Sequence, residues 1–265
     1  MMIQRILVYS FLMFLSAIVS CSSPTAKPNT AVKPEATFYQ YNIWAAFVNK
    51  VFDGHLKVSE LKEHGNIGLG SFDYLDGELV MLDGKAYRVR ENGVISEGKD
   101  DDEIVYADAC FFKSDTAVLL NSFVNYDLLR SQLNQQLPTA NHFYAFTIQG
   151  VFDSVTLGGL HKQSLPFKQG LDVLIPQRPV FKGKNVTGTM VGFYCPQFIG
   201  DINTAAYHFH FISDDKKLGG HVMEISSGKK LTVNLQKLPH YQFDMPASPI
   251  FDTVKFDKQF QYNKK

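Results

Sequence analysis

The sequence predicts an α+β protein with two β-rich subdomains and mixed sheets. Phe and Tyr are abundant, with 22 Phe and 12 Tyr against a single Trp, and aromatic side chains pack well on the pleated surface of a sheet. Short apolar stretches alternate with Gly-containing turns along most of the chain, whereas few stretches have helical spacing. A length of 265 residues is enough for one large domain or two small ones.

The charge of the chain is balanced, because 26 Lys and Arg offset 26 Asp and Glu. A formal net charge of zero gives no electrostatic reason for nucleic acid or an anionic membrane surface to be the main partner.

The first 20 residues have the pattern of a bacterial lipoprotein signal peptide. Arg5 provides a positive charge, residues 6–19 are apolar but short for a membrane span, and small residues lead into Cys21. Acylation of Cys21 would make the chain a lipid-anchored membrane protein of the cell envelope, on the periplasmic or surface side. The alternative is a plain signal peptide whose cleavage falls near a cysteine. Residues 21–36 are rich in Pro, Ser, Thr, Ala and Lys and are expected to form a flexible tether.

Two further cysteines, Cys110 and Cys195, would share an oxidising compartment if Cys21 is lipidated. Nothing in the sequence places them within bridging distance. We expect two buried thiols, and a disulfide stays open as the alternative.

The folded part is expected to begin near residue 38 with two helices and a group of strands. Apolar residues three and four apart predict a helix over 41–52, and Ser59 can cap a short second helix that ends before Gly65. Two Asp-Gly pairs then separate short apolar stretches, which predicts hairpins. The strands of this region are expected at 72–75, 78–82 and 85–89.

The rest of the chain is predicted to be mainly strands, with one helix over 126–136 between strands at 105–112 and 143–152. Residues 158–177 are rich in Gly, Pro, Lys and Gln and are expected to form a long connection. This connection divides the chain into an N-terminal α+β subdomain, 37–177, and a C-terminal β-rich subdomain, 178–265. Further strands are expected at 179–181, 186–195, 206–213, 220–226 and 230–235.

Three histidines in the C-terminal subdomain form the strongest candidate site. Side chains alternate along a strand, so His208 and His210 share one face. The polar turn that follows and the Gly219-Gly220 pair can return the chain as a hairpin, which places His221 opposite them. Three converging imidazoles are the ligands of a catalytic zinc ion with an open fourth position. A single His on a strand is more often a core or surface residue, and the residues alone leave the chemistry of the site open.

Several ordered motifs resemble those of the alpha-acetolactate decarboxylase family, from about Tyr39 to Glu224. The matching stretches are GNIGLGSF (65–72), LDGELV (75–80), LDGKAY (82–87), NHFYA (141–145), GTMVGF (188–193), YHFHF (207–211) and GGHV (219–222).

This resemblance implies a zinc ion on His208, His210 and His221 that chelates the ketone and hydroxyl oxygens of 2-acetolactate, a small-molecule substrate converted to acetoin and carbon dioxide. Glu78 matches an active-site glutamate and is the candidate for proton transfer. Without the resemblance, Glu78 is simply a polar strand residue after a turn. The family also implies a homodimer.

Two departures from the family pattern concern charged residues. In an alignment without gaps, the position of an essential family arginine corresponds to Gly158. Lys162 or His161 would then have to replace the arginine. A second family glutamate lies near the C-terminus, whereas no Asp or Glu follows Asp257 here.

These observations leave three hypotheses. The first is a zinc-dependent carboxy-lyase acting on 2-acetolactate or a related 2-hydroxy-3-oxo acid, slowed by the missing arginine. The second is an impaired metal-binding homologue that binds a ligand or protein in the envelope, and the third is a metal-dependent hydrolase or isomerase.

Overall fold

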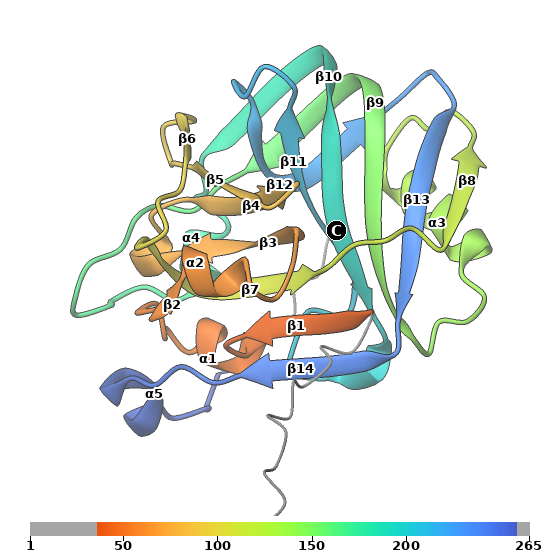
Figure 1. The fold of residues 1–265 in the computed structure, drawn as a ribbon. Coiled ribbons are helices and arrows are strands. Elements are labelled where there is room, and N and C mark those ends of the chain that lie inside the picture. Colours follow the sequence, from red (N-terminus) through yellow and green to blue (C-terminus); the bar gives the residue numbers. More distant parts are fainter. Residues whose placement is uncertain (1–35, 259–265) are drawn as a thin grey trace, which may run out of the picture. The chain divides into compact units, whose positions relative to one another are not determined.

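The computed structural model describes residues 36–258 of the chain (Figure 1). The predicted signal peptide, the tether up to residue 35 and the candidate lipidation site Cys21 lie outside the described residues. None of the described helices is long and apolar enough to cross a membrane.

The first sheet has eight strands in the order β14-β1-β7-β3-β4-β5-β6, with β2 paired to β7. Its strands are β1 (Thr37–Tyr41), β2 (Leu56–Lys57), β3 (Ile67–Phe72), β4 (Glu78–Leu82), β5 (Lys85–Val89), β6 (Ile95–Glu97), β7 (Glu103–Cys110) and β14 (His240–Asp244). The pair β1–β14 is parallel and the other pairs are antiparallel, so the sheet is mixed.

The second sheet has six strands in the order β10-β11-β12-β9-β13-β8. These are β8 (Thr116–Leu120), β9 (Phe143–Gly158), β10 (Val180–Cys195), β11 (Ala206–Ser213), β12 (Gly219–Ser226) and β13 (Leu231–Leu238). Because β9 pairs with both β10 and β12, the strands β9, β10, β11 and β12 close into a ring (Figure 1). The two β-rich sheets with few helices confirm the predicted fold class.

The helices are short, except one. They are α1 (Trp44–Val48), α2 (Val58–Leu61), α3 (Tyr126–Gln136), α4 (Leu171–Leu174) and α5 (Pro249–Thr253), with single 3-10 turns at Asp73–Leu75 and Gln197–Ile199. Helix α3 has the predicted bounds, because Leu129 and Leu133 reach the core and the Asn125 side chain accepts a hydrogen bond from the Leu128 backbone N–H at 2.8 Å.

The predicted helix over 41–52 was wrong at both ends. Residues 37–41 form β1, and only residues 44–48 are α-helical. The strand pairs with β7 on one side and β14 on the other, which lie far away in the sequence. A positive φ of 65° at Asn42 separates the strand from the helix. The predicted strand at 72–75 was also wrong, because β3 ends at Phe72 and a 3-10 turn follows.

The predicted connection over 158–177 corresponds to residues 159–179 in the structure, and it contains α4. Strand β9 extends to Gly158, and β10 is one continuous strand where two were expected. These two strands form a long antiparallel pair, from Val180 opposite Gly158 to Tyr194 opposite Tyr144. Strands β8 and β9 therefore belong to the same sheet as β10 to β13, although they precede residue 177.

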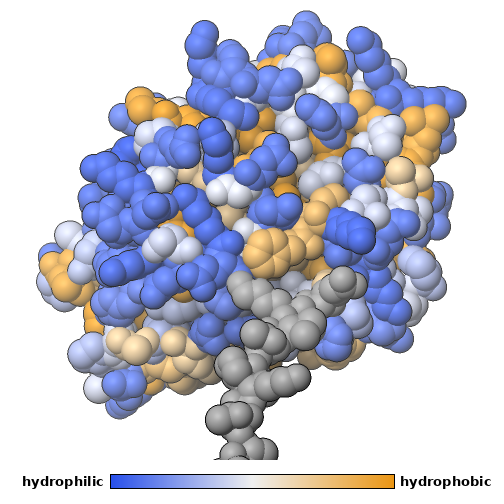
Figure 2. Space-filling model, viewed as in Figure 1, coloured by the Kyte–Doolittle hydropathy of each residue, from blue (hydrophilic) through white to orange (hydrophobic). Residues whose placement is uncertain are grey.

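The core lies between the two sheets and inside the strand ring. One buried cluster joins Leu69 and Val80 of the first sheet to Val191 and Ile212 of the second, and a larger aromatic cluster fills the ring. Hydrophilic residues are spread over most of the face in Figure 2, with smaller apolar patches between them. Cys110 and Cys195 are buried free thiols, as expected.

Candidate metal centre and its pocket

The three histidines meet as the predicted hairpin requires. His208 and His210 lie on β11, and His210 is directly opposite His221 on β12. One ring nitrogen of each residue lies within 4.8 Å of those of the other two. In the described part of the chain, this is the group of His, Cys, Asp and Glu side chains that can hold a metal ion.

The strand pattern explains why the imidazoles point one way. Phe209 and Phe211 are buried in the aromatic cluster inside the ring, and Tyr207 packs against it. The alternate residues therefore face outward, toward β4 of the first sheet, which contacts β11 and β12 (Figure 1). Gly220 allows the close approach of β9, because a Cβ atom there would lie 2.6 Å from the Gly158 carbonyl oxygen.

His210 is held in the tautomer that a metal ligand needs. Its Nδ1 lies 2.7 Å from the Leu79 carbonyl oxygen, which only accepts hydrogen bonds, so Nδ1 carries the proton. The Nε2 atom then has a lone pair that points into the site. Burial lowers the pKa of His210 to about 4, which keeps this imidazole neutral at physiological pH.

The spacing of the other two rings also fits a metal. His208 Nε2 and His221 Nδ1 lie 3.1 Å apart. Tetrahedral zinc with nitrogen ligands at 2.0–2.1 Å places those nitrogens about 3.3 Å from one another. Three imidazole nitrogens on one side of an open pocket therefore fit a catalytic ion that keeps a fourth position for substrate or water.

Glu78 is the first residue of β4 and lies beside this group. Its Oε2 atom is 3.5 Å from His210 Nε2, and the residue is 6% exposed. Burial raises the pKa of Glu78 to about 8, although the positive charge of Arg178 acts in the opposite direction. A buried carboxyl group that holds its proton near neutral pH can act as a proton donor.

A pocket of about 490 Å³ opens in front of the histidines and Glu78. One wall is apolar and is formed by Trp44, Phe47, Leu160, Leu171 and Ile175. Arg130, Arg178, Asp201 and Asn203 supply polar and charged groups. The volume suits a small molecule, and the convergent polar groups can orient it.

A buried hydrogen-bond network supports the loop before β11. Asn203 donates from Nδ2 to Gln40 Oε1 at 2.7 Å and to Asp108 Oδ1 at 2.9 Å, and its Oδ1 accepts from the Tyr106 hydroxyl at 2.8 Å. Burial raises the pKa of Asp108 to about 8, and the hydrogen bond from Asn203 lowers it in part. Because Asn203 and Tyr106 both line the pocket, this network ties one wall of the pocket to the first sheet.

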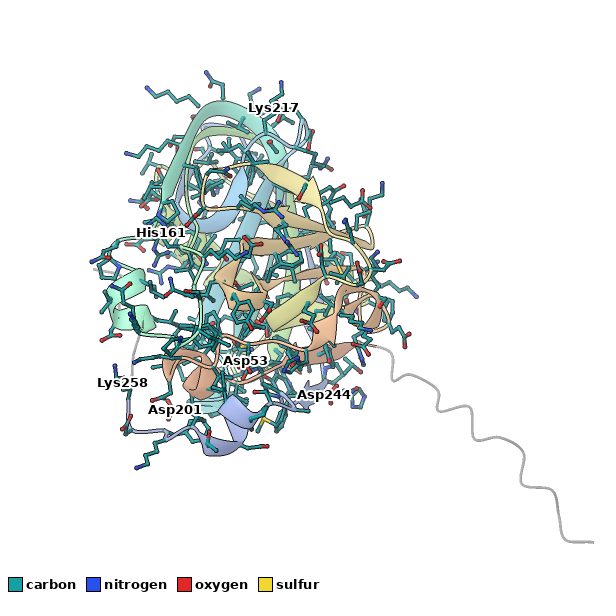
Figure 3. All side chains as sticks on the ribbon, turned by 90° about the vertical axis from the view of Figure 1, so that its left-hand side faces the viewer. Asp53, His161, Asp201, Lys217, Asp244 and Lys258 are labelled. Atoms are coloured by element: carbon teal, nitrogen blue, oxygen red, sulfur yellow. The ribbon has the colours of Figure 1, made fainter. Side chains whose placement is uncertain are left out.

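The two residues proposed to replace the family arginine lie elsewhere. His161 is at the molecular surface (Figure 3), where its ring contacts Glu91 Oε2 at 2.9 Å and the Gln177 carbonyl at 3.1 Å. Lys162 Nζ lies 3.4 Å from Asp76 Oδ2, and its side chain is 54% exposed. Neither residue lines the pocket. The sequence reasoning missed Arg130 and Arg178, which do line it.

The acidic side chains of the pocket are Glu78 and Asp201. Within the described residues, no acidic residue after His221 lines it.

Comparison with known proteins places these features in a family. The family model for alpha-acetolactate decarboxylase matches residues 38–258. The alpha-acetolactate decarboxylase of Methanosarcina mazei is 32% identical over 234 residues, covering 88% of this chain and 81% of the relative. The Bacillus licheniformis enzyme is 31% identical over 220 residues, covering 83% and 86%.

Solved structures agree with the sequence matches. The crystal structure of alpha-acetolactate decarboxylase from Bacillus subtilis strain 168 superposes with a TM-score of 0.80 at 29% identity, covering 84% of this chain and 94% of that one. A Staphylococcus aureus protein of unknown function, described as similar to alpha-acetolactate decarboxylase, gives a TM-score of 0.79 at 28% identity, covering 83% and 94%. The matched range, 38–258, contains the three histidines, Glu78 and the residues that line the pocket. The chain therefore belongs to the alpha-acetolactate decarboxylase family.

Proposed function

We propose that the protein is a zinc-dependent decarboxylase that converts 2-acetolactate, or a related 2-hydroxy-3-oxo acid, to acetoin and carbon dioxide. The observation that carries this proposal is the convergence of His208, His210 and His221 beside the buried Glu78, in a chain of this family. Of the three hypotheses from the sequence, the decarboxylase is the one that the family match supports.

Each group of the pocket has a part in this reaction. His208, His210 and His221 would hold the zinc ion, and its positive charge would stabilise the substrate oxygens on which negative charge develops. When the bond to the carboxyl carbon breaks, carbon dioxide leaves and the electron pair stays on the remaining fragment. Glu78 then donates its proton to the carbon atom that carried the carboxyl group. The apolar wall around Trp44 and Leu171 limits the access of water to the reacting atoms.

Acetoin formation from racemic 2-acetolactate tests the proposal. The zinc-loaded protein is expected to release acetoin and carbon dioxide in equal amounts, because the reaction splits one substrate molecule into these two products. Heat-treated protein with the same zinc content serves as the control for spontaneous decarboxylation. A zinc-loaded, folded protein that gives no acetoin above this control would contradict the proposal and leave the impaired, ligand-binding homologue as the better hypothesis.

We also propose that the protein is anchored in the cell envelope through a lipid on Cys21. This rests on the sequence pattern of residues 1–21, and the homodimer implied by the family likewise stays a prediction. Cys21→Ser is expected either to leave the protein unprocessed or to release it in soluble form, because serine has no thiol to acylate. Membrane fractionation with labelled fatty acid measures both effects. Unlipidated wild-type protein in the soluble periplasmic fraction would argue against the anchor.

A further inference from the structure

We propose that Arg178 supplies the guanidinium group that binds the carboxylate of the substrate, and that it takes the place of a side chain from position 158. This inference rests on the proposed function and names the residue that recognises the acid group. Arg178 lines the same pocket as Glu78 and the three histidines.

The strand register shows where a side chain at position 158 would point. Gly158 lies at the end of β9, opposite His221 on β12 and opposite Val180 on β10. Residues directly opposite one another in antiparallel strands have their side chains on the same face of the sheet. A side chain at position 158 would therefore project beside His221, toward the metal site.

Arg178 already occupies that space. A Cβ atom built on Gly158 would lie 2.7 Å from Arg178 Cδ and 3.0 Å from Arg178 Nη1. The arginine side chain thus lies directly over the Gly158 backbone, and a side chain at this position would require Arg178, and also Met223 with its Sδ at 3.0 Å, to move. The missing side chain at Gly158 leaves space for Arg178. The guanidinium therefore reaches the pocket from the segment before β10 instead of from the end of β9.

Local contacts hold Arg178 in this position. Its Nε donates to the Ile175 carbonyl at 3.0 Å, which fixes the side chain after α4. The next residue, Pro179, accepts a hydrogen bond at 3.1 Å from the Gly159 backbone N–H, which ties this segment to the end of β9. Its positive charge lies in the same cavity as the Glu78 carboxyl group, because both residues line the pocket.

The other cations near the site are less suited to this role. Arg130 lines the pocket, but its Nη2 is paired with Asp127 and its guanidinium lies 5.3 Å from the Tyr126 ring centroid. The Lys162 ammonium is paired with Asp76. A guanidinium group also matches a carboxylate better than an ammonium group does, because its planar fork binds both carboxylate oxygens.

The expected slow turnover followed from the missing arginine at position 158. Arg178 removes that reason, because it places a guanidinium group in the same pocket.

Binding of non-reactive ligands tests Arg178 without any turnover. The probe is 2,3-dihydroxy-2-methylbutanoate, which has the carboxylate of acetolactate but no ketone, and the matched neutral probe is 2,3-butanediol, which lacks the carboxylate. Calorimetry on the zinc-loaded Arg178→Gln protein is expected to show an acid affinity reduced on the order of 10²-fold, the size of a lost charge-assisted pair. The diol affinity is expected to change little. Unchanged acid affinity would overturn the inference.

One further variant and a control variant outside the pocket secure this result. Arg178→Lys keeps the charge but not the fork, so its acid affinity is expected to be intermediate. Arg90→Gln makes the same chemical change at an arginine that pairs with Asp76 and does not line the pocket, so it is expected to bind the acid as the wild type does. Zinc content and thermal unfolding, measured for every variant, identify any that are misfolded.

Moving the arginine provides the second test. Gly158→Arg alone is expected not to improve acid binding, because its Cβ would collide with the Arg178 side chain. The double variant Gly158→Arg, Arg178→Gly places the guanidinium on β9 beside His221 and is expected to recover most of the affinity lost in Arg178→Gln. A double variant as weak as Arg178→Gln, although folded and loaded with zinc, would contradict the equivalence of the two positions.

Failure of this inference can be distinguished from failure of the proposed function. Acetoin production that Arg178→Gln leaves unchanged in both kcat and KM would overturn the role of Arg178 and leave the decarboxylase intact. Arg178-dependent binding of the acid without acetoin production would overturn the decarboxylase function and leave the role of Arg178 intact. Where both hold, KM is expected to rise more than kcat falls, because the carboxylate is bound in the ground state and leaves as neutral carbon dioxide.

Discussion

Replacing His208 and His210 together by alanine is expected to abolish zinc binding and, with it, acetoin formation. Two of the three imidazoles that lie within 4.8 Å of one another would be lost, which leaves His221 as the remaining ligand of the group. A single neutral imidazole cannot hold a divalent ion that takes three protein ligands in catalytic sites. Elemental analysis of protein purified without added metal is expected to give about one zinc per wild-type chain and almost none in the double variant.

The control for this experiment is His240→Ala. His240 is exposed on β14 in the first sheet and does not line the pocket, so its zinc content is expected to match the wild type. Thermal unfolding of the double variant distinguishes loss of the ligands from loss of the fold. Wild-type zinc content in a folded double variant would show that the ion is bound elsewhere or that the histidines are structural.

Glu78→Gln is expected to lower kcat by roughly 10²–10⁴-fold, the usual contribution of a positioned general acid or base. Glutamine has nearly the same volume as glutamic acid, but it has no carboxyl proton to transfer. The metal ligands are untouched, so zinc content and the affinity for 2,3-dihydroxy-2-methylbutanoate are expected to stay close to those of the wild type. Steady-state kinetics and calorimetry separate the two quantities.

Glu97→Gln is the matched substitution at the surface. Glu97 lies on β6 with its side chain 53% exposed and pairs with Lys85 at 3.9 Å, so its replacement is expected to leave kcat unchanged. If Glu78→Gln kept kcat within a few-fold of the wild type, another group would have to deliver the proton. Asp201, the other acidic residue of the pocket, would be the next to replace.

The metal centre could be predicted because its geometry is local. His208 and His210 share a face by the alternation of any strand, and a short polar turn returns the chain so that His221 lies opposite. These relations depend on residues within 14 positions of one another. The same holds for α3, whose spacing and Asn125 cap lie within its own turns, and for the hairpin of β4 and β5 around Asp83-Gly84.

The start of the fold could not be predicted in this way. No strand was predicted for residues 37–41, yet they form β1 because β7 and β14 offer hydrogen-bonding edges on both sides. Those edges come from residues 103–110 and 240–244, and no local pattern refers to them. Pairing over such distances is decided by the packing of the whole sheet.

The sequence by itself determined the three histidines and their shared face, together with a resemblance that identified Glu78. Only the tertiary structure decided what surrounds them. The Leu79 carbonyl that orients His210 lies 131 positions away in the chain, and it reaches the ring because β4 packs against β11. In the sequence, Gly158 stands where the family is expected to have an arginine. In the structure, the Arg178 side chain occupies the space beside Gly158. Strand alternation and tight turns are local, but which side chain enters a pocket depends on the contacts between distant strands.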